Sequence, residues 1–175
     1  SFPVLILGFI FIKLEIVDKF RTLQTIGWAT IGFGILLFLS DKFKTDKKIE
    51  TDFNLGSAIF IGTLHSLSII PGVSRLGIAL TAARFLNFSR YDAAKLSFLL
   101  SIPTLFAVSS YGLYEVYTTH DIEVTHINSI YIILSFLFSY ITIKFFLEYI
   151  QRFSLTIFVV YRLVVGSLIL MYSYL

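Results

Sequence analysis

The segment Phe53–Phe85 reads FNLGSAIFIGTLHSLSIIPGVSRLGIALTAARF, and it decides how the rest of the chain must fold. Its first 22 residues, Phe53–Ser74, contain no Asp, Glu, Lys or Arg. That length is enough for a helix to cross a hydrocarbon core of about 30 Å. The pair Pro71-Gly72, however, lies near the middle of the whole segment and is typical of a turn. The segment therefore predicts two helical arms joined by a turn at membrane depth.

The composition places the whole chain in a membrane. Of the 175 residues, 57% are hydrophobic and 14% are charged, whereas an ordinary soluble domain has about 25% charged residues. The mean hydropathy is +0.85. These values exclude a soluble domain, a disordered chain and a coiled coil. The absence of cysteine excludes disulfides, thiolate chemistry and Cys-type zinc sites. We expect a single integral membrane domain, 1–175, of the all-α class.

The charged residues cluster, and the gaps between the clusters have the length of membrane segments. At 1.5 Å per residue, uncharged runs of about 20 residues match a ~30 Å core. Two further apolar runs flank them, of which the last is interrupted only by Arg162. The pattern predicts about five or six transmembrane helices plus the hairpin, a polytopic membrane protein. The runs are Ser1–Ile12, Thr22–Ser40, Phe53–Ser74, Leu96–Tyr114, Val124–Ile143 and Phe153–Leu175.

Orientation follows from the excess of Lys and Arg in cytoplasmic loops. The loop 41–52 has four lysines and the stretch 84–95 adds three basic residues, so we place both in the cytoplasm. The loop 115–123 has three acidic residues and no Lys or Arg, so we place it outside, together with the C-terminus. Residues 53–86 then begin and end on the same face. A re-entrant helical hairpin satisfies this constraint, because non-helical backbone at that depth is tolerated when it is buried in protein or lines a wet cavity.

The end of this hairpin is the strongest candidate for a functional site. Gly72, Ser74 and Arg75 come directly at or after the turn, where a new helix begins. The N-terminus of a broken helix directs its amides and positive dipole end at the turn. A guanidinium and a hydroxyl added there make an anion site suited to phosphate. The alternative, in which Arg75 extends to the membrane surface, fits the order Pro-Gly-x-Ser-Arg less well. The Lys and Arg residues form no stripe interleaved with aromatics, so nucleic acid is not an expected partner.

Three other residues carry open alternatives. His65 is either a buried histidine bonded to backbone or a helper at the phosphate site. Arg162, preceded by Tyr161, either pairs with backbone carbonyls or an acid on a neighbouring helix, or lies near the substrate without contacting it. The spacing of the histidines and acids in the outer loop fits no strong metal-site pattern, so no metal is expected there. Those loop residues are His120, Asp121, Glu123 and His126.

The order of these features resembles the bacterial undecaprenyl-diphosphate phosphatases, the bacitracin-resistance family. The run Gly62–Gly77, GTLHSLSIIPGVSRLG, is similar to the second signature of that family. Ser97–Pro103 is similar to the helix after the signature, Ile31–Leu37 to the helix before it, and Phe158–Gly166 to the closing helix. The resemblance covers nearly the whole chain.

The resemblance implies a fold and an activity. The family fold is an inverted repeat with one re-entrant hairpin in each half, and the enzyme hydrolyses undecaprenyl diphosphate to the monophosphate in the bacterial cytoplasmic membrane. Arg75 would then hold a phosphate, Ser74 would hydrogen-bond it or assist the attack, and Gly72 and His65 would lie at the same phosphate. The implied partners are a long-chain isoprenyl diphosphate and a second copy of the chain in a homodimer. A divalent cation, Mg²⁺ or Ca²⁺, is also implied.

This sequence departs from the family pattern at several places. Leu76 and Ala79 stand where the signature has Ser and Thr, and His65 stands where Gln or Glu is usual. The acidic first hairpin of the family, which would hold the cation, has no counterpart, so we expect an N-terminal repeat to be missing before Ser1. Two alternatives therefore stay open beside the phosphatase. One is a transporter or flippase of the lipid carrier, because broken helices are also a transporter device. The other is an inactive remnant of the family.

Overall fold

The computed structural model describes residues 2–13, 20–43, 45, 47–118 and 126–175. Apart from one isolated bridge, the regular structure in these residues is helical, which confirms the all-α class. The elements are α1 (Phe2–Lys13), α3 (Leu23–Asp41), α4 (Ile49–Asp52), α5 (Leu55–His65), the 3-10 helix η1 (Ser66–Ile69), α6 (Arg75–Phe85), α7 (Arg90–Thr118), α8 (His126–Arg152) and α9 (Thr156–Tyr174).

Four of these helices, α3, α7, α8 and α9, are long and apolar enough to cross a membrane. This confirms the expected polytopic membrane protein. The first apolar run becomes α1, whose 12 residues span about 18 Å at 1.5 Å per residue. The run Phe53–Ser74 contributes no crossing helix, because it forms α5, η1 and the turn that follows them.

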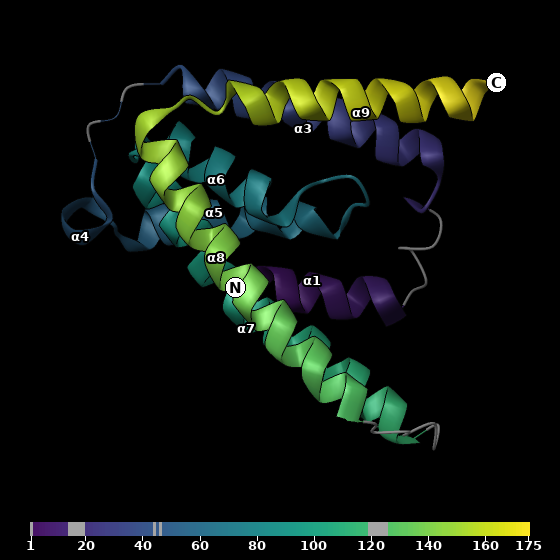
Figure 1. Ribbon diagram of the computed structural model, residues 1–175. Coiled ribbons are helices and arrows are strands. Elements are labelled where there is room, and N and C mark those ends of the chain that lie inside the picture. The colour runs from purple at the N-terminus through teal and green to yellow at the C-terminus, as the bar shows by residue number, and fades with distance from the viewer. Residues whose placement is uncertain (1, 14–19, 44, 46, 119–125) are drawn as a thin grey trace.

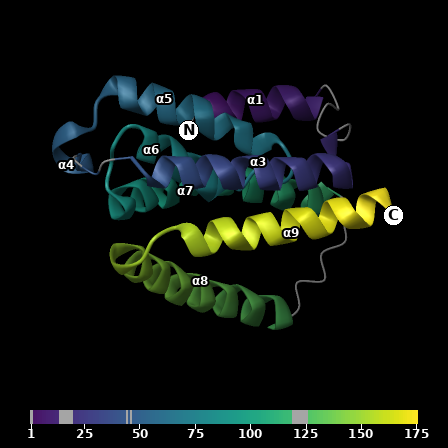
Figure 2. The same ribbon diagram turned by 90° about the horizontal axis from the view of Figure 1, so that it is seen from above.

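The segment after α4 doubles back on itself. In both ribbon views α5 and α6 lie side by side, with the connecting turn directed toward the end of the molecule where the C-terminus lies (Figures 1 and 2). At the opposite end the amide of Lys47 donates to the carbonyl of Asn87 at 3.1 Å, and the amide of Ser89 donates to the carbonyl of Lys47 at 3.2 Å. Both ends of the hairpin therefore lie at the basic loop, as expected from the charge pattern.

Local sequence explains where each arm begins and where the chain turns. The side chain of Asn54 accepts a hydrogen bond from the amide of Ser57 at 2.9 Å and caps the start of α5. Between the arms, the amide of Val73 donates to the carbonyl of Ile70 at 3.1 Å. Gly72 has φ +91° there, which is the left-handed value required at the third position of a type II turn. The predicted roles of Pro71 and Gly72 are confirmed.

Helices α3 and α9 pack so closely that two positions at their contact have no room for a side chain. A Cβ on Gly27 would lie 2.6 Å from Leu170 Cδ2, and a Cβ on Gly166 would lie 2.6 Å from Ile31 Cγ1. Small residues that allow such an approach are the usual means of packing helices in membranes. The pair α3 and α9 therefore forms a close-packed wall beside the hairpin (Figure 1).

A buried arginine joins the helix ends near the basic loop. The side chain of Arg84 is 1% exposed, and its Nη1 donates to the carbonyl of Phe88 at 2.6 Å. Its Nη2 donates to the carbonyls of Asp41 at 3.1 Å and Phe43 at 2.7 Å. The Asp41 carboxylate lies 3.8 Å from Arg84 Nε and accepts two hydrogen bonds from Arg90, at 2.6 and 2.9 Å. We call Asp41, Arg84 and Arg90 the base cluster, because it fixes the base of the hairpin to α3 and α7.

Candidate functional site

The tip of the hairpin is fixed against α3 by its own backbone. The carbonyl of Gly72 accepts a hydrogen bond from Arg162 Nη2 at 2.9 Å and a longer one from Thr30 Oγ1 at 3.4 Å. Arg162 Nε also donates to the carbonyl of Thr30 at 3.4 Å. A Cβ on Gly72 would lie 2.5 Å from the carbonyl oxygen of Ile26, so only glycine permits this approach. The guanidinium from α9 thus joins the tip to α3.

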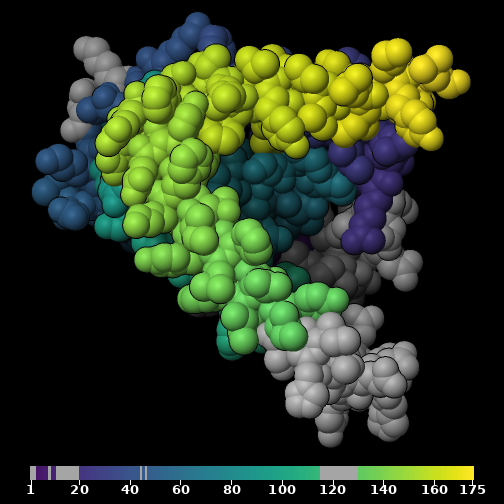
Figure 3. All heavy atoms as spheres, viewed as in Figure 1, coloured from purple at the N-terminus to yellow at the C-terminus, as the bar shows by residue number. Residues whose placement is uncertain are grey.

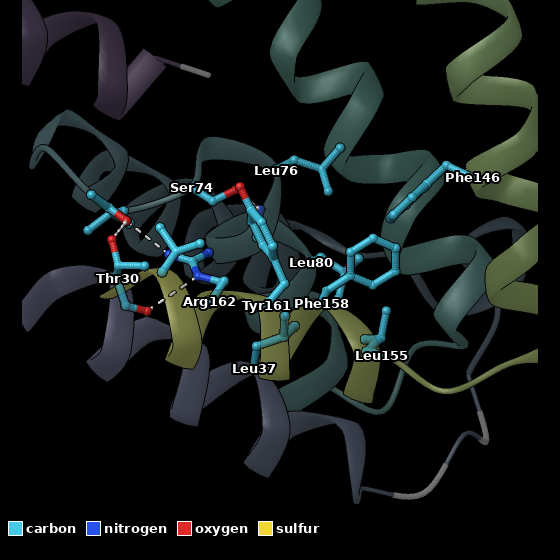
Figure 4. Close-up of a pocket in the computed structure, with 14 residues that line it drawn as sticks. Thr30, Leu37, Ser74, Leu76, Leu80, Phe146, Leu155, Phe158, Tyr161 and Arg162 are labelled. Atoms are coloured by element: carbon cyan, nitrogen blue, oxygen red, sulfur yellow. Dashed lines mark hydrogen bonds between the residues drawn. The ribbon is translucent and has the colours of Figure 1, made fainter. Parts of the chain in front are cut away.

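Beside the tip lies a cavity of about 440 Å³ between α3, α6, α8 and α9. The close-up shows Thr30, Ser74 and Arg162 on one side of it and Leu80, Leu155 and Phe146 on the other (Figure 4). In the space-filling view the teal atoms of the hairpin are visible in the recess between α8 and α9 (Figure 3). The cavity is therefore polar at one end and apolar at the other. Its remaining lining residues are Leu37, Gly72, Val73, Leu76, Gly77, Phe158, Tyr161 and Val165.

Ser74 lines the polar end and begins α6. Its Oγ accepts a hydrogen bond from the amide of Gly77 at 3.1 Å, the arrangement of a helix N-cap. Since a hydroxyl both donates and accepts, its proton stays available to a ligand oxygen. The amides of Arg75 and Leu76, in the first turn of α6, have no intrahelical acceptor, because the helix begins there. The start of α6 thus supplies several hydrogen-bond donors at one place.

Arg75 and His65 do not line this cavity. Arg75 is half-buried and makes no hydrogen bond or ion pair with the described residues. His65 is fully buried, and within the described part of the chain both of its ring nitrogens have no hydrogen-bond partner. The two lie within electrostatic range of each other. Of the predicted site residues, the structure brings Gly72, Ser74, Tyr161 and Arg162 to the cavity, whereas Arg75 and His65 are not part of its lining.

The side chains in the described residues do not fit a resident divalent cation. No three residues of the His, Cys, Asp or Glu type lie together there, and the cavity lining contains no carboxylate. Hard cations such as Mg²⁺ and Ca²⁺ require oxygen ligands, mainly carboxylates. The loop residues His120, Asp121 and Glu123 lie outside the described residues, as does the side chain of His126.

Sequence reasoning missed Thr30 and the apolar wall. Thr30 takes part through its backbone carbonyl as well as its hydroxyl, and no side-chain pattern marks a carbonyl. Phe146 on α8 and Phe158 on α9 are two of many phenylalanines in apolar runs. Only the neighbouring Tyr161-Arg162 pair gave a signal that this part of α9 faces a site.

A family model described as "Bacitracin resistance protein BacA" matches residues 1–168. This chain belongs to that family. Three curated relatives are named undecaprenyl-diphosphatase. The chain is 42% identical to the one from Pelagibacter ubique over 175 residues, covering 99% of this chain and 68% of the relative. It is 33% identical to the one from Jannaschia sp., covering 99% and 65%, and 38% identical to the one from Teredinibacter turnerae, covering 97% and 64%.

The chain therefore spans about two thirds of the length of these bacitracin-resistance relatives. Two of the three departures from the family pattern, Leu76 and Ala79, differ in their surroundings. Leu76 lines the cavity next to Ser74, whereas Ala79 is fully buried inside the helix packing and does not line it. Only the replacement at Leu76 removes a hydroxyl from the cavity surface.

Proposed function

We propose that this chain is the site-bearing part of a phosphatase that hydrolyses undecaprenyl diphosphate to undecaprenyl phosphate and inorganic phosphate. One observation supports this above the others: a single cavity has a cluster of phosphate-binding donors at one end and an apolar wall at the other. That combination matches a ligand with a charged head and a hydrocarbon tail. The names of the relatives and the family membership support the same substrate class.

The reaction exchanges one bond at the terminal phosphorus. The oxygen of water forms a bond to the terminal phosphorus, and the bond between this phosphorus and the bridging oxygen breaks. The bridging oxygen leaves with the lipid monophosphate, and the protons of water pass to the released phosphate and to solvent. The protein contributes by holding the phosphate oxygens and neutralising the charge that develops on them.

We assign the donors at the tip to this task. The guanidinium of Arg75 makes no hydrogen bond or ion pair with the described residues, so its donors are available to a phosphate. The Ser74 hydroxyl and the first amides of α6 lie at the start of the same helix, and the positive end of the helix adds to their effect. The resemblance to the family also implies a divalent cation. Because the described residues do not fit one, no step here depends on it.

The test measures phosphate release from undecaprenyl diphosphate in detergent micelles. The 175-residue protein is compared with the same protein preceded by the N-terminal segment of the Pelagibacter ubique relative. We expect release by the extended protein, and a fall of about 100-fold or more in its Arg75→Ala variant, because one charged donor at a developing oxyanion contributes that much. Arg152→Ala, an exposed arginine outside the cavity, is the matched control and should leave release unchanged.

Two results would contradict the proposal. Unchanged release in Arg75→Ala would remove Arg75 from the site. If neither protein releases phosphate although vesicles containing the extended protein move the lipid phosphate across the bilayer, the chain is a carrier and not a hydrolase.

We also propose that the basic loop is cytoplasmic in the bacterial inner membrane and that the C-terminus is outside, as the distribution of Lys and Arg favours. The protein has no cysteine, so single cysteines can be labelled without background. With a membrane-impermeant maleimide on intact spheroplasts, we expect Leu175→Cys to react at once and Lys48→Cys to react only after permeabilisation. Both side chains are exposed. The reverse labelling would invert the topology.

A further inference from the structure

The guanidinium of Arg162 has hydrogen-bonding capacity that the protein does not use. The side chain is 9% exposed and lies in a membrane-spanning helix, yet no acidic residue pairs with it in the described part of the chain. Its Nε and Nη2 donate to the carbonyls of Thr30 and Gly72. Its Nη1 makes no hydrogen bond with the described residues, and it is not shut off from the cavity. A buried cation without a counter-ion is costly, so a group with negative charge is the expected occupant beside Nη1.

The position of Nη1 is set by the first turn of α6. A Cβ on Gly77 would lie 2.9 Å from Arg162 Nη1 and 3.1 Å from Ser74 Oγ, so Gly77 is where the guanidinium and the hydroxyl meet the helix. The N-terminal amides of α6 and its positive dipole end lie at the same turn. Three kinds of donor thus meet at one end of a cavity whose lining has no carboxylate.

The apolar wall begins directly beside this group. Leu76 and Leu80 follow Ser74 along α6, and Phe158 and Leu155 precede Arg162 along α9. Phe146 of α8 completes the wall (Figure 4). A hydrocarbon chain on this wall must be joined to the anion at Arg162. Arg75 does not line the cavity.

We propose that the two arginines divide the diphosphate between them. Arg162 Nη1, with the Ser74 hydroxyl, binds the phosphate that is esterified to the lipid, while Arg75 binds the terminal phosphate that is released. This assignment rests on the proposed hydrolase function. It makes Arg162 a substrate-binding residue from α9, and it makes the cavity the place where the lipid monophosphate remains after the bond is broken.

The test uses binding and not turnover, so it is informative even if no hydrolysis is observed. The probes are farnesyl phosphate, farnesol and inorganic pyrophosphate, each titrated by calorimetry into the purified 175-residue protein in detergent. We expect Arg162→Gln to lower the affinity for farnesyl phosphate about 10-fold or more, because a charge-assisted hydrogen bond is lost. The affinity for farnesol should be unchanged. Arg75→Gln should weaken pyrophosphate and leave farnesyl phosphate nearly unchanged.

A second variant separates binding from folding, because Arg162 also fixes the tip of the hairpin. Gly77→Ala keeps the arginine and crowds its Nη1 and the Ser74 side chain with a methyl group. The affinity for farnesyl phosphate should therefore fall while the affinity for farnesol stays the same. The proposal is overturned if the unaltered protein does not bind farnesyl phosphate, or if Arg162→Gln and Gly77→Ala both bind it normally. It is also overturned if farnesol is lost in parallel, which would make Arg162 purely structural. If the binding results are as expected but the extended protein releases no phosphate from undecaprenyl diphosphate, the hydrolase function is overturned and the binding assignment stands.

Discussion

The two buried arginines at opposite ends of the hairpin have very different surroundings. Arg84, at the base, donates to three backbone carbonyls and lies 3.8 Å from the Asp41 carboxylate. Arg162, at the tip, has two carbonyl acceptors, no acidic partner among the described residues, and one nitrogen open to a cavity. The difference teaches that burial alone does not identify a functional arginine. Arg84 also lines a cavity, of about 400 Å³, but its one unpaired nitrogen, Nε, is fully buried and lies 3.8 Å from the Asp41 carboxylate. What distinguishes Arg162 is an unpaired donor that is not fully buried and has no acidic partner among the described residues.

The largest effect on stability is expected at the base cluster. Arg84→Met leaves three carbonyls without this donor, that of the buried Phe88 among them, and removes charge from beside Asp41. Breaking a buried pair in this way costs about 3 kcal/mol of unfolding free energy. Arg90→Met, at a side chain 34% exposed, should cost about 1 kcal/mol. Thermal unfolding in detergent, followed by far-UV circular dichroism, measures both. Equal losses would show that burial of Arg84 adds nothing.

The next effect is expected where the tip meets α3. Gly72→Ala places a Cβ 2.5 Å from the carbonyl oxygen of Ile26 and forces an alanine to φ +91°. The strain is of order 1–3 kcal/mol and moves the carbonyl that Arg162 holds. We expect weaker farnesyl phosphate binding together with a lower melting temperature, measured on the same sample. Normal binding in this variant would mean that the tip need not be fixed for Arg162 to act.

A smaller, favourable effect is expected at Leu76. Leu76→Ser returns a hydroxyl to the cavity surface beside Ser74, where a phosphate oxygen can accept from it. Inorganic pyrophosphate should bind a few-fold more tightly, and the farnesyl chain should lose part of its wall. Ala79→Thr is the matched control, because Ala79 does not line the cavity and is fully buried. It should lower stability without improving affinity. Equal gains in the two variants would contradict this geometry.

The smallest effect is expected at Asp52, whose hydrogen bonds are to Lys48 and Thr51 and not to either buried arginine. Hydrogen bonds from the Lys48 amide and the Thr51 hydroxyl lower the pKa of its carboxyl below the usual value. A lowered folded-state pKa stabilises the protein above the unfolded pKa and is lost as pH falls through the folded one. Between about pH 5 and 8 this group therefore adds no pH dependence. Asp52→Asn should therefore lower the melting temperature only slightly, and by the same amount at pH 5 and at pH 8. A change in melting temperature that differs between these two pH values would contradict this assignment.

The charge pattern predicted that the segment after the basic loop turns back on itself, and the paired helices α5 and α6 agree with this. Its re-entry within the membrane stays a prediction. The Pro71-Gly72 turn was predictable because only a few residue types tolerate its backbone angles. The separation of Arg75 from the cavity was not predictable. Neighbouring residues point roughly 100° apart on a helix, so a motif that is continuous in sequence can face two places. Backbone carbonyls were one of the expected partners of Arg162, and the structure supplies them from Thr30 and Gly72. Which carbonyls these would be was not predictable, because every residue has one.

The attachment of the hairpin at both ends also bears on how a lipid reaches the cavity. The hairpin is held by hydrogen bonds at both ends, through the carbonyl of Gly72 at the tip and through the side chain of Arg84 at the base. Helix α8 is held mainly at one end. Its residues 130–145 are all exposed, whereas Ile150, near its C-terminus, and Leu155, at the start of α9, are buried. Of the cavity walls, α8 therefore yields with the least loss of packing. If the cavity binds a lipid as proposed, we expect the tail to enter past Phe146 while the donors at the tip stay in place.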